Sequence, residues 1–117
     1  MLVKAREDTD IHSSIVSPKT NYDGSDVAMI KAPIQIDYGL NVRIHPSCFI
    51  NRDCFIADSP DCMVSIGEHT VIGVSARILG VTHPIDWRER KGRQGPRVAG
   101  DVVIGKNCFI GANVIVL

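Results

Sequence analysis

The chain has few aromatic residues and no excess of charge of either sign, and these shortages exclude several classes of protein. Aromatic residues make up 5% of its 117 residues, and 13 Lys and Arg balance 13 Asp and Glu for a net charge of +0. A balanced charge without a basic block argues against a nucleic-acid partner or an acidic membrane surface. No apolar run approaches the roughly 20 residues that span a bilayer, and no signal-peptide core is present. We therefore expect one soluble, cytoplasmic domain.

Leucine is also scarce. The chain contains only 4 Leu against 15 Ile and 13 Val, whereas a helical bundle is rich in Leu and Ala. The β-branched residues favour extended backbone. The composition therefore predicts an all-β protein.

A six-residue repeat organises most of the chain. Aliphatic residues recur every six positions in three groups of three: Ile44, Ile50, Ile56; Ile66, Ile72, Ile78; and Ile104, Ile110, Val116. Three hexads make one coil of 18 residues, and such coils bury their aliphatics only by stacking into a three-sided prism. The frame predicts about three coils over residues 34–117, one long corner loop at 84–101, and an irregular lead-in at 1–33.

Small residues hold fixed places in this frame. A glycine directly follows the aliphatic at four positions, Gly67, Gly73, Gly105 and Gly111, where we expect it to help the backbone turn. Three cysteines, Cys48, Cys54 and Cys108, stand four places after the aliphatic, so we interpret them as free thiols filling the interior rather than as disulfides. Cys62 lies in the first break of the frame and has no assigned role.

Metal binding is not predicted. The histidines, His12, His45, His69 and His83, fall at unrelated offsets of the repeat, and no CxxC pair is present. A protein-bound metal would need such residues to converge.

The repeat resembles a known enzyme family once two further motifs are included. Asp37-Tyr38-Gly39-Leu40-Asn41 precedes the frame, and Val81-Thr82-His83-Pro84 precedes the long loop. Over roughly residues 32–117 the chain resembles the acetyltransferases of the left-handed parallel β-helix family, in the branch of the maltose, galactoside and nodulation-factor O-acetyltransferases. The resemblance implies a left-handed parallel β-helix, acetyl-CoA as co-substrate, and a homotrimer with active sites between subunits.

The resemblance implies a catalytic role for His83. In this family the corresponding histidine removes the proton from a sugar-type hydroxyl as it attacks the thioester of acetyl-CoA, without an acyl-enzyme. Imidazole suits this task because its ordinary pKa of about 6.5 leaves it largely neutral at pH 7. The alternative is a solvated corner histidine with no chemical role.

Three polar residues match the acceptor pocket of the family: Asp37, Asn51 and Asp58. Carboxylates and an amide suit a polyol because each bonds several hydroxyl groups. Each also has a structural alternative. Asp58 stands beside Ser59 and could organise a turn, Asn51 could be a small polar filler, and Asp37 could be solvated.

The residues that match the coenzyme site are Phe109, Gly111 and Ala112. Phe109 stands where the family usually has Trp, so an aromatic wall remains without the indole donor. The backbone N–H of Ala112 aligns with the amide that helps to hold the thioester in relatives, and a backbone donor survives side-chain changes.

The main departure from the family lies after Val116, where relatives continue through further coils. We expect either a fragment of a longer enzyme or a shortened relative with impaired coenzyme binding. The alternative function is therefore a truncated, non-catalytic prism that serves as an interaction or scaffold protein or is an inactive relative. A zinc enzyme of the carbonic-anhydrase type on the same fold would need paired histidine ligands, which the spacing of His69 and His83 does not favour.

Overall fold

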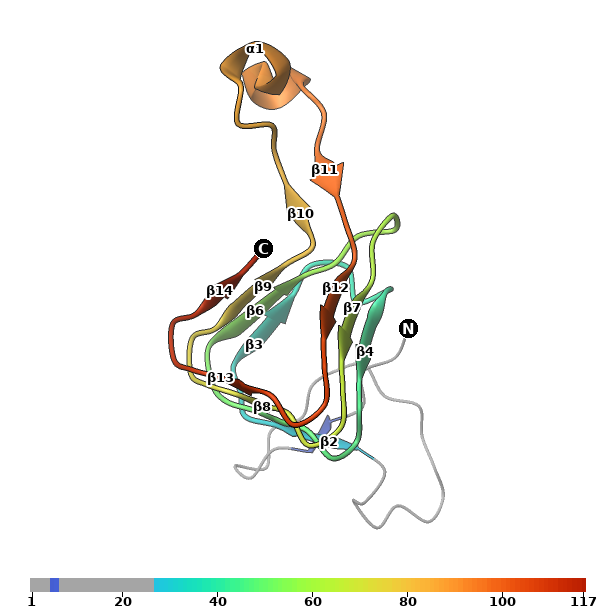
Figure 1. Cartoon of the computed structure of the whole chain (residues 1–117), viewed down its shortest axis with the longest axis vertical. Coiled ribbons are helices and arrows are strands. Elements are labelled where there is room, and N and C mark those ends of the chain that lie inside the picture. Colours follow the sequence, from blue (N-terminus) through green and yellow to red (C-terminus); the bar gives the residue numbers. More distant parts are fainter. Residues whose placement is uncertain (1–4, 7–26) are drawn as a thin grey trace.

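The computed structural model describes residues 5–6 and 27–117. Its strands form three parallel sheets that enclose a triangular prism (Figure 1). Sheet 1 contains β1 (Ala5–Arg6), β2 (Ala28–Ile30), β5 (Phe49–Ile50), β8 (Val71–Ile72) and β13 (Phe109–Ile110). Sheet 2 contains β3 (Ile34–Ile36), β6 (Cys54–Ala57), β9 (Arg77–Leu79) and β14 (Ile115–Val116), and sheet 3 contains β4 (Val42–Ile44), β7 (Val64–Ile66) and β12 (Val102–Ile104).

The chain visits the sheets in turn, so three full coils stack along the prism. They are β4-β5-β6, β7-β8-β9 and β12-β13-β14. The strands pair in register, so the aliphatics of the frame stack exactly in the three predicted columns, Ile44–Ile66–Ile104, Ile50–Ile72–Ile110 and Ile56–Ile78–Val116. These side chains form the hydrophobic core, and burying them is the main favourable term in folding. The predicted all-β, parallel β-helix is confirmed.

The stacked strands begin earlier than the frame indicates. Strands β2 and β3 precede the first full coil, and they place Ile30 against Ile50 and Ile36 against Ile56. Strand β2 thus lies within the segment that the sequence analysis treats as a lead-in. Its place was hidden because the next aliphatic, Ile44, follows Ile36 after eight residues instead of six. The rest of that segment, residues 1–4 and 7–26, lies outside the described residues.

The corners of the prism turn at a different residue from the one expected. The left-handed backbone conformation falls on the third residue after the interior aliphatic, at Asp53, His69, Ser75, Asn107 and Asn113, with φ between 55° and 60°. The glycines that directly follow the aliphatic do not have positive φ. They are needed for close approach instead, because a Cβ on Gly73 would lie 2.7 Å from the backbone nitrogen of Ala112 in the next coil.

The close approach of Gly73 to the backbone of the next coil leads to a prediction about stability. Gly73→Ala should destabilise the fold by about 1–3 kcal/mol, because the new methyl group meets backbone that cannot move aside. Gly111→Ala is the matched control, since it occupies the same slot one coil later and its Cβ would meet only Val114 Cγ2 at 3.8 Å. Thermal unfolding of both variants checks this, and equal losses of stability would contradict it.

The cysteines are free thiols, as expected, and three of the four are buried. Cys48 Sγ donates a hydrogen bond to the Gly67 carbonyl oxygen at 2.9 Å, and Thr70 Oγ1 in the same slot of the next coil donates to the Gly105 carbonyl at 2.8 Å. At these two positions the interior slot therefore holds a side-chain donor for a carbonyl of the next coil. Cys62 Sγ accepts a hydrogen bond from Ser59 Oγ at 3.3 Å.

The long corner loop is an arm that projects from the prism (Figure 1). Its root is an antiparallel pair, β10 (Val81–Thr82) with β11 (Val98–Ala99), and its tip holds α1 (Trp87–Arg90) and the 3-10 helix η1 (Gly92–Gln94). Asp86 caps α1 by accepting from the N–H of Arg88, and no residue of α1 is buried. None of the helices in the described residues is long and apolar enough to cross a membrane.

Candidate active site

Two corners of the prism hold nearly all of the candidate site residues. The corner that follows the sheet 2 strands, which we call the arm corner, consists of residues 37–41, 58–63 and 80–101 and carries Asp37, Asp58 and His83. The corner that follows the sheet 1 strands, the glycine corner, consists of residues 51–53, 73–76 and 111–114 and carries Asn51, Gly111 and Ala112. Phe109 stands just before it on β13. Within one chain, sheet 2 separates the two corners.

His83 lines a cavity of about 530 Å³ between the arm root and the third coil. The side chains around it are mostly apolar and include Ile85, Val98 and Leu117. His83 itself is exposed, and within the described part of the chain its imidazole has no hydrogen-bond partner. A ring nitrogen is therefore available to accept a proton from a molecule in this cavity.

Asp58 is fully buried, with 0% of its surface exposed. One carboxylate oxygen accepts from the backbone N–H groups of Tyr38 and Gly39 at 2.9 and 3.1 Å. The other accepts from those of Leu40 and Asn41 at 2.9 and 3.0 Å. Burial alone would raise the pKa of this carboxyl, but the four N–H donors outweigh it and hold the pKa below its ordinary value. Asp58 therefore binds the backbone of the turn at 38–41. This is the alternative role given for it above, in which it organises a turn.

The same turn is tied to the next one along the arm corner. Asn41 Nδ2 donates to the carbonyl oxygens of Ser59 and Pro60 at 2.8 and 3.2 Å. Gly39 has φ of 70°, a conformation that glycine adopts without steric cost. Together with the Asp58 bonds, these contacts make the 37–41 and 58–62 turns a single unit.

The arm root is joined to this unit. Gly80 N–H donates to the Ala57 carbonyl at 2.9 Å, and Met63 N–H donates to Asp101 Oδ1 at 2.8 Å. Arg97, just before β11, places both terminal guanidinium nitrogens near the Tyr38 hydroxyl, at 3.4 and 3.5 Å.

The charges around Arg97 also belong to the arm corner. The hydrogen bond to Tyr38 raises the pKa of the Arg97 guanidinium, and the carboxylates of Asp37 and Asp61 shift that pKa in the same direction. Asp37 thus lies within electrostatic reach of the arm that carries His83. The pair of Tyr38 and Arg97 was not predicted from the sequence. Both lie in segments singled out by the sequence, but no periodicity joins residues 59 positions apart.

The glycine corner offers different groups. Asn51, Gly73 and Gly111 stack in one column, because Asn51 N–H donates to Ile72 and Gly73 N–H donates to Ile110. Asn51 Oδ1 accepts from its neighbour Arg52 at 2.8 Å. In the part of the chain that the structure covers, the Ala112 N–H has no acceptor, and Phe109 is 76% exposed. An N–H donor of this kind can hold a carbonyl oxygen, and an exposed ring can pack against a flat group.

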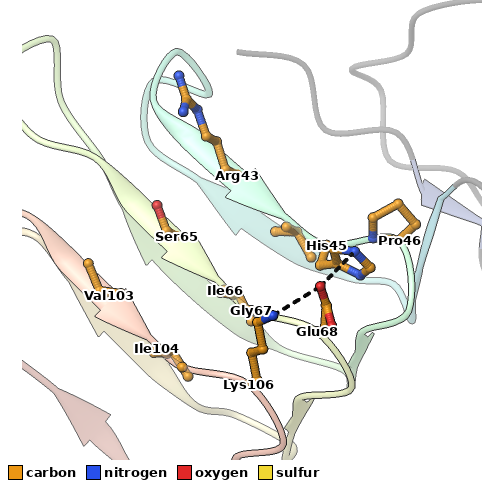
Figure 2. A pocket seen from close by; sticks show the side chains of 12 residues that line it. Arg43, His45, Pro46, Ser65, Ile66, Gly67, Glu68, Val103, Ile104 and Lys106 are labelled. Carbon is orange, nitrogen blue, oxygen red and sulfur yellow. Dashed lines mark ion pairs between the residues drawn. The ribbon is translucent and has the colours of Figure 1, made fainter.

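A second hollow of about 600 Å³ lies on the outer face of sheet 3 and holds none of the candidate residues (Figure 2). Glu68 Oε1 lies 3.3 Å from Lys106 Nζ and 3.9 Å from His45 Nε2. These three side chains come from consecutive coils, so the ion pairs link the stacked turns. At such exposed positions each pair contributes at most about 1 kcal/mol.

Among residues 5–6 and 27–117, no three His, Cys, Asp or Glu side chains gather closely enough to hold a metal ion.

Comparison with known proteins identifies relatives. No family model and no solved structure matches the chain. Nodulation protein L of Rhizobium leguminosarum bv. viciae is 37% identical over 90 residues, covering 77% of this chain and 45% of the relative. Nodulation protein L of Rhizobium meliloti is 36% identical over 90 residues, covering 77% of this chain and 47% of the relative. A Schizosaccharomyces pombe protein named "Putative acetyltransferase" is 31% identical over 96 residues, covering 82% and 44%.

The chain spans slightly less than half the length of these relatives. The stacked parallel coils and these similarities together support a relation of the chain to the hexapeptide-repeat acetyltransferases.

Proposed function

We propose that the protein is an acyltransferase that moves an acetyl group from acetyl-CoA to a hydroxyl of a sugar or a similar polar small molecule. The observation that carries this proposal is the unpartnered imidazole of His83 in the cavity of about 530 Å³ at the arm root. A general base must reach the proton it removes, and an imidazole without an internal partner is free to do so. The acetyltransferase relatives supply the reaction class.

The proposed reaction is a direct transfer. A ring nitrogen of His83 removes the proton of the acceptor hydroxyl while the oxygen attacks the thioester carbonyl carbon. The resulting oxyanion needs a donor, and the free N–H of Ala112 is suited to that role. The C–S bond then breaks, and the departing CoA sulfur takes the proton from the imidazolium. Atoms and charge balance without a metal.

The placement of these groups supports a site shared between two copies of the chain. His83 and Asp37 belong to the arm corner, whereas Asn51, Gly111 and Ala112 belong to the glycine corner across sheet 2. One chain does not bring them to one side of the prism. A cyclic homotrimer would place the arm corner of each copy against the glycine corner of the next, and it would close without free ends.

The candidate residues fall into two groups: those proposed to contact a ligand directly, and Asp58, whose oxygens bind backbone N–H groups. We propose that the side chains of Asp37 and Asn51 bind acceptor hydroxyls. Phe109, Gly111 and Ala112 are the proposed contacts for acetyl-CoA. Asp58 was expected in the acceptor pocket, but both of its oxygens are occupied by backbone donors. We propose that Asp58 serves the acceptor site indirectly, by shaping the turn that follows Asp37.

The test is a direct assay of transfer. The protein is incubated with acetyl-CoA and a panel of mono- and disaccharides, and both CoA release and the mass of the sugar product are measured. We expect an O-acetylated sugar, saturation by acetyl-CoA, and no acetylated protein. A well-folded oligomer that neither binds nor turns over acetyl-CoA would refute the proposal and favour a non-catalytic interaction or scaffold prism.

A further inference from the structure

We propose that Tyr38 and Arg97 form a latch that positions the arm, and with it His83, against the prism. The effect on catalysis rests on the proposed function. The mechanical part, which is that the contact restricts the motion of the arm, does not depend on it. Three observations carry the inference: a rigid support under Tyr38, the lack of other hydrogen bonds between residues 83–97 of the arm and the prism among the described residues, and the register of the arm strands.

The support is the Asp58 carboxylate. Its four backbone hydrogen bonds span 2.9 to 3.1 Å and fix every residue of the turn from Tyr38 to Asn41. A carboxylate that accepts from successive N–H groups forms stronger, charge-assisted bonds. The backbone that carries the Tyr38 ring is therefore held in place, and the hydroxyl is presented at a defined point of the arm corner.

The latch is the polar connection between the outer part of the arm, residues 83–97, and the prism. Arg88 bonds to Asp86, and Arg90 bonds to the carbonyls of Pro84 and Ile85, so both arginines act within the arm. Within the described part of the chain, the Arg97 bonds to Tyr38 are the hydrogen bonds that join residues 83–97 to the prism. Both terminal nitrogens of the guanidinium share the hydroxyl oxygen, which fixes direction as well as distance.

The register of the arm connects this contact to His83. Val81 pairs with Ala99 and Thr82 pairs with Val98 in the antiparallel root. The next facing positions are His83 and Arg97, just beyond the last paired residues. Because Arg97 faces His83 across the antiparallel pair, a contact that fixes Arg97 also restricts the motion of the chain directly opposite the proposed base. We conclude that Tyr38 and Arg97 are positioning residues, with Asp58 as their support.

The mechanical part is tested with the single tryptophan of the chain, Trp87, which lies on α1 of the arm and is 71% exposed. Tyr38→Phe removes only the hydroxyl. We expect the local motion of Trp87, measured by fluorescence anisotropy decay, to increase in amplitude by about twofold or more, since residues 83–97 of the arm lose their hydrogen bonds to the prism while the bonds at the arm root remain. Arg97→Ala should have the same effect, and the double variant should add nothing. Unchanged anisotropy in Tyr38→Phe would overturn the latch.

The catalytic part is tested with acetyl-CoA and whichever sugar of the panel turns over. We expect Tyr38→Phe to lower kcat by about 3- to 10-fold with little change in KM for acetyl-CoA, as follows from losing a hydrogen bond of ordinary strength that acts through His83. Arg93→Ala is the control, because it removes the same charge from the arm but no contact with the prism. A loosened arm with unchanged kcat would overturn the positioning role. If the wild-type protein shows no turnover, the proposed function fails, and the anisotropy result still decides the latch.

Discussion

Replacing His83 by alanine should lower the rate of acetyl transfer by about 10²- to 10⁴-fold, the usual contribution of a positioned general base. The imidazole is the titratable group that lines the arm-root cavity and lacks any partner among the described residues. Without it, the acceptor hydroxyl must lose its proton to water during the attack. The measurement is kcat/KM with acetyl-CoA and the sugar that gives the highest turnover.

The loss of activity must come from the missing imidazole and not from unfolding of the variant. His83 is exposed and is not part of the core, so the variant should unfold at nearly the wild-type temperature. His69→Asn is the matched control. It removes a histidine from another corner and keeps a residue that tolerates the φ of 55° found there. If His83→Ala retained more than about half of the activity, the assignment of the base would be wrong.

Replacing Asp58 by alanine should destabilise the protein by about 2–5 kcal/mol, because four backbone N–H groups at the arm corner would lose their acceptor. For a domain of this size that corresponds to a fall in Tm of about 10 °C or more. Asp61→Ala is the control, since this exposed aspartate lies in the same turn without supporting the 38–41 backbone. Similar Tm values for the two variants would contradict the structural role of Asp58.

The same carboxylate should make stability depend on pH. Its pKa is lowered in the folded protein, so the unfolded chain binds its proton first as the pH falls. The stabilisation is fully present above the ordinary value of about 3.9 and is lost as the pH falls through the folded pKa. The difference in unfolding free energy between wild type and Asp58→Asn should therefore shrink below about pH 4. A difference that stays constant into strong acid would contradict this.

The fold was largely predictable from spacing. A hexapeptide frame assigns the interior position of every coil, and the register of Ile50 on Ile72 follows from that alone. The frame failed where spacing changed. Eight residues separate Ile36 from Ile44, so the pattern concealed β2, which precedes the predicted start of the repeat region at residue 34. The role of the glycines was also misjudged, because the approach of Ala112 to Gly73 depends on how closely successive coils stack.

The site was only partly predictable. The Thr-His-Pro motif makes His83 the candidate base, and the structure places that residue at a cavity. The surroundings of Asp58 could not be deduced, since its four donors lie 17 to 20 residues away and become neighbours only when successive turns stack. Tyr38 and Arg97 are further apart still. Such contacts follow from tertiary structure, which local patterns do not encode.

Sharing of the active site between the arm corner of one copy and the glycine corner of another is what the proposed function requires of the assembly. It is tested by mixing His83→Ala with Asn51→Ala and allowing subunits to exchange. In a cyclic trimer each site then has about one chance in four of combining two intact corners, so we expect about a quarter of wild-type activity from two weakly active variants. Activity that stays at the average of the separate variants after complete exchange would show that the two corners do not meet and would contradict the account.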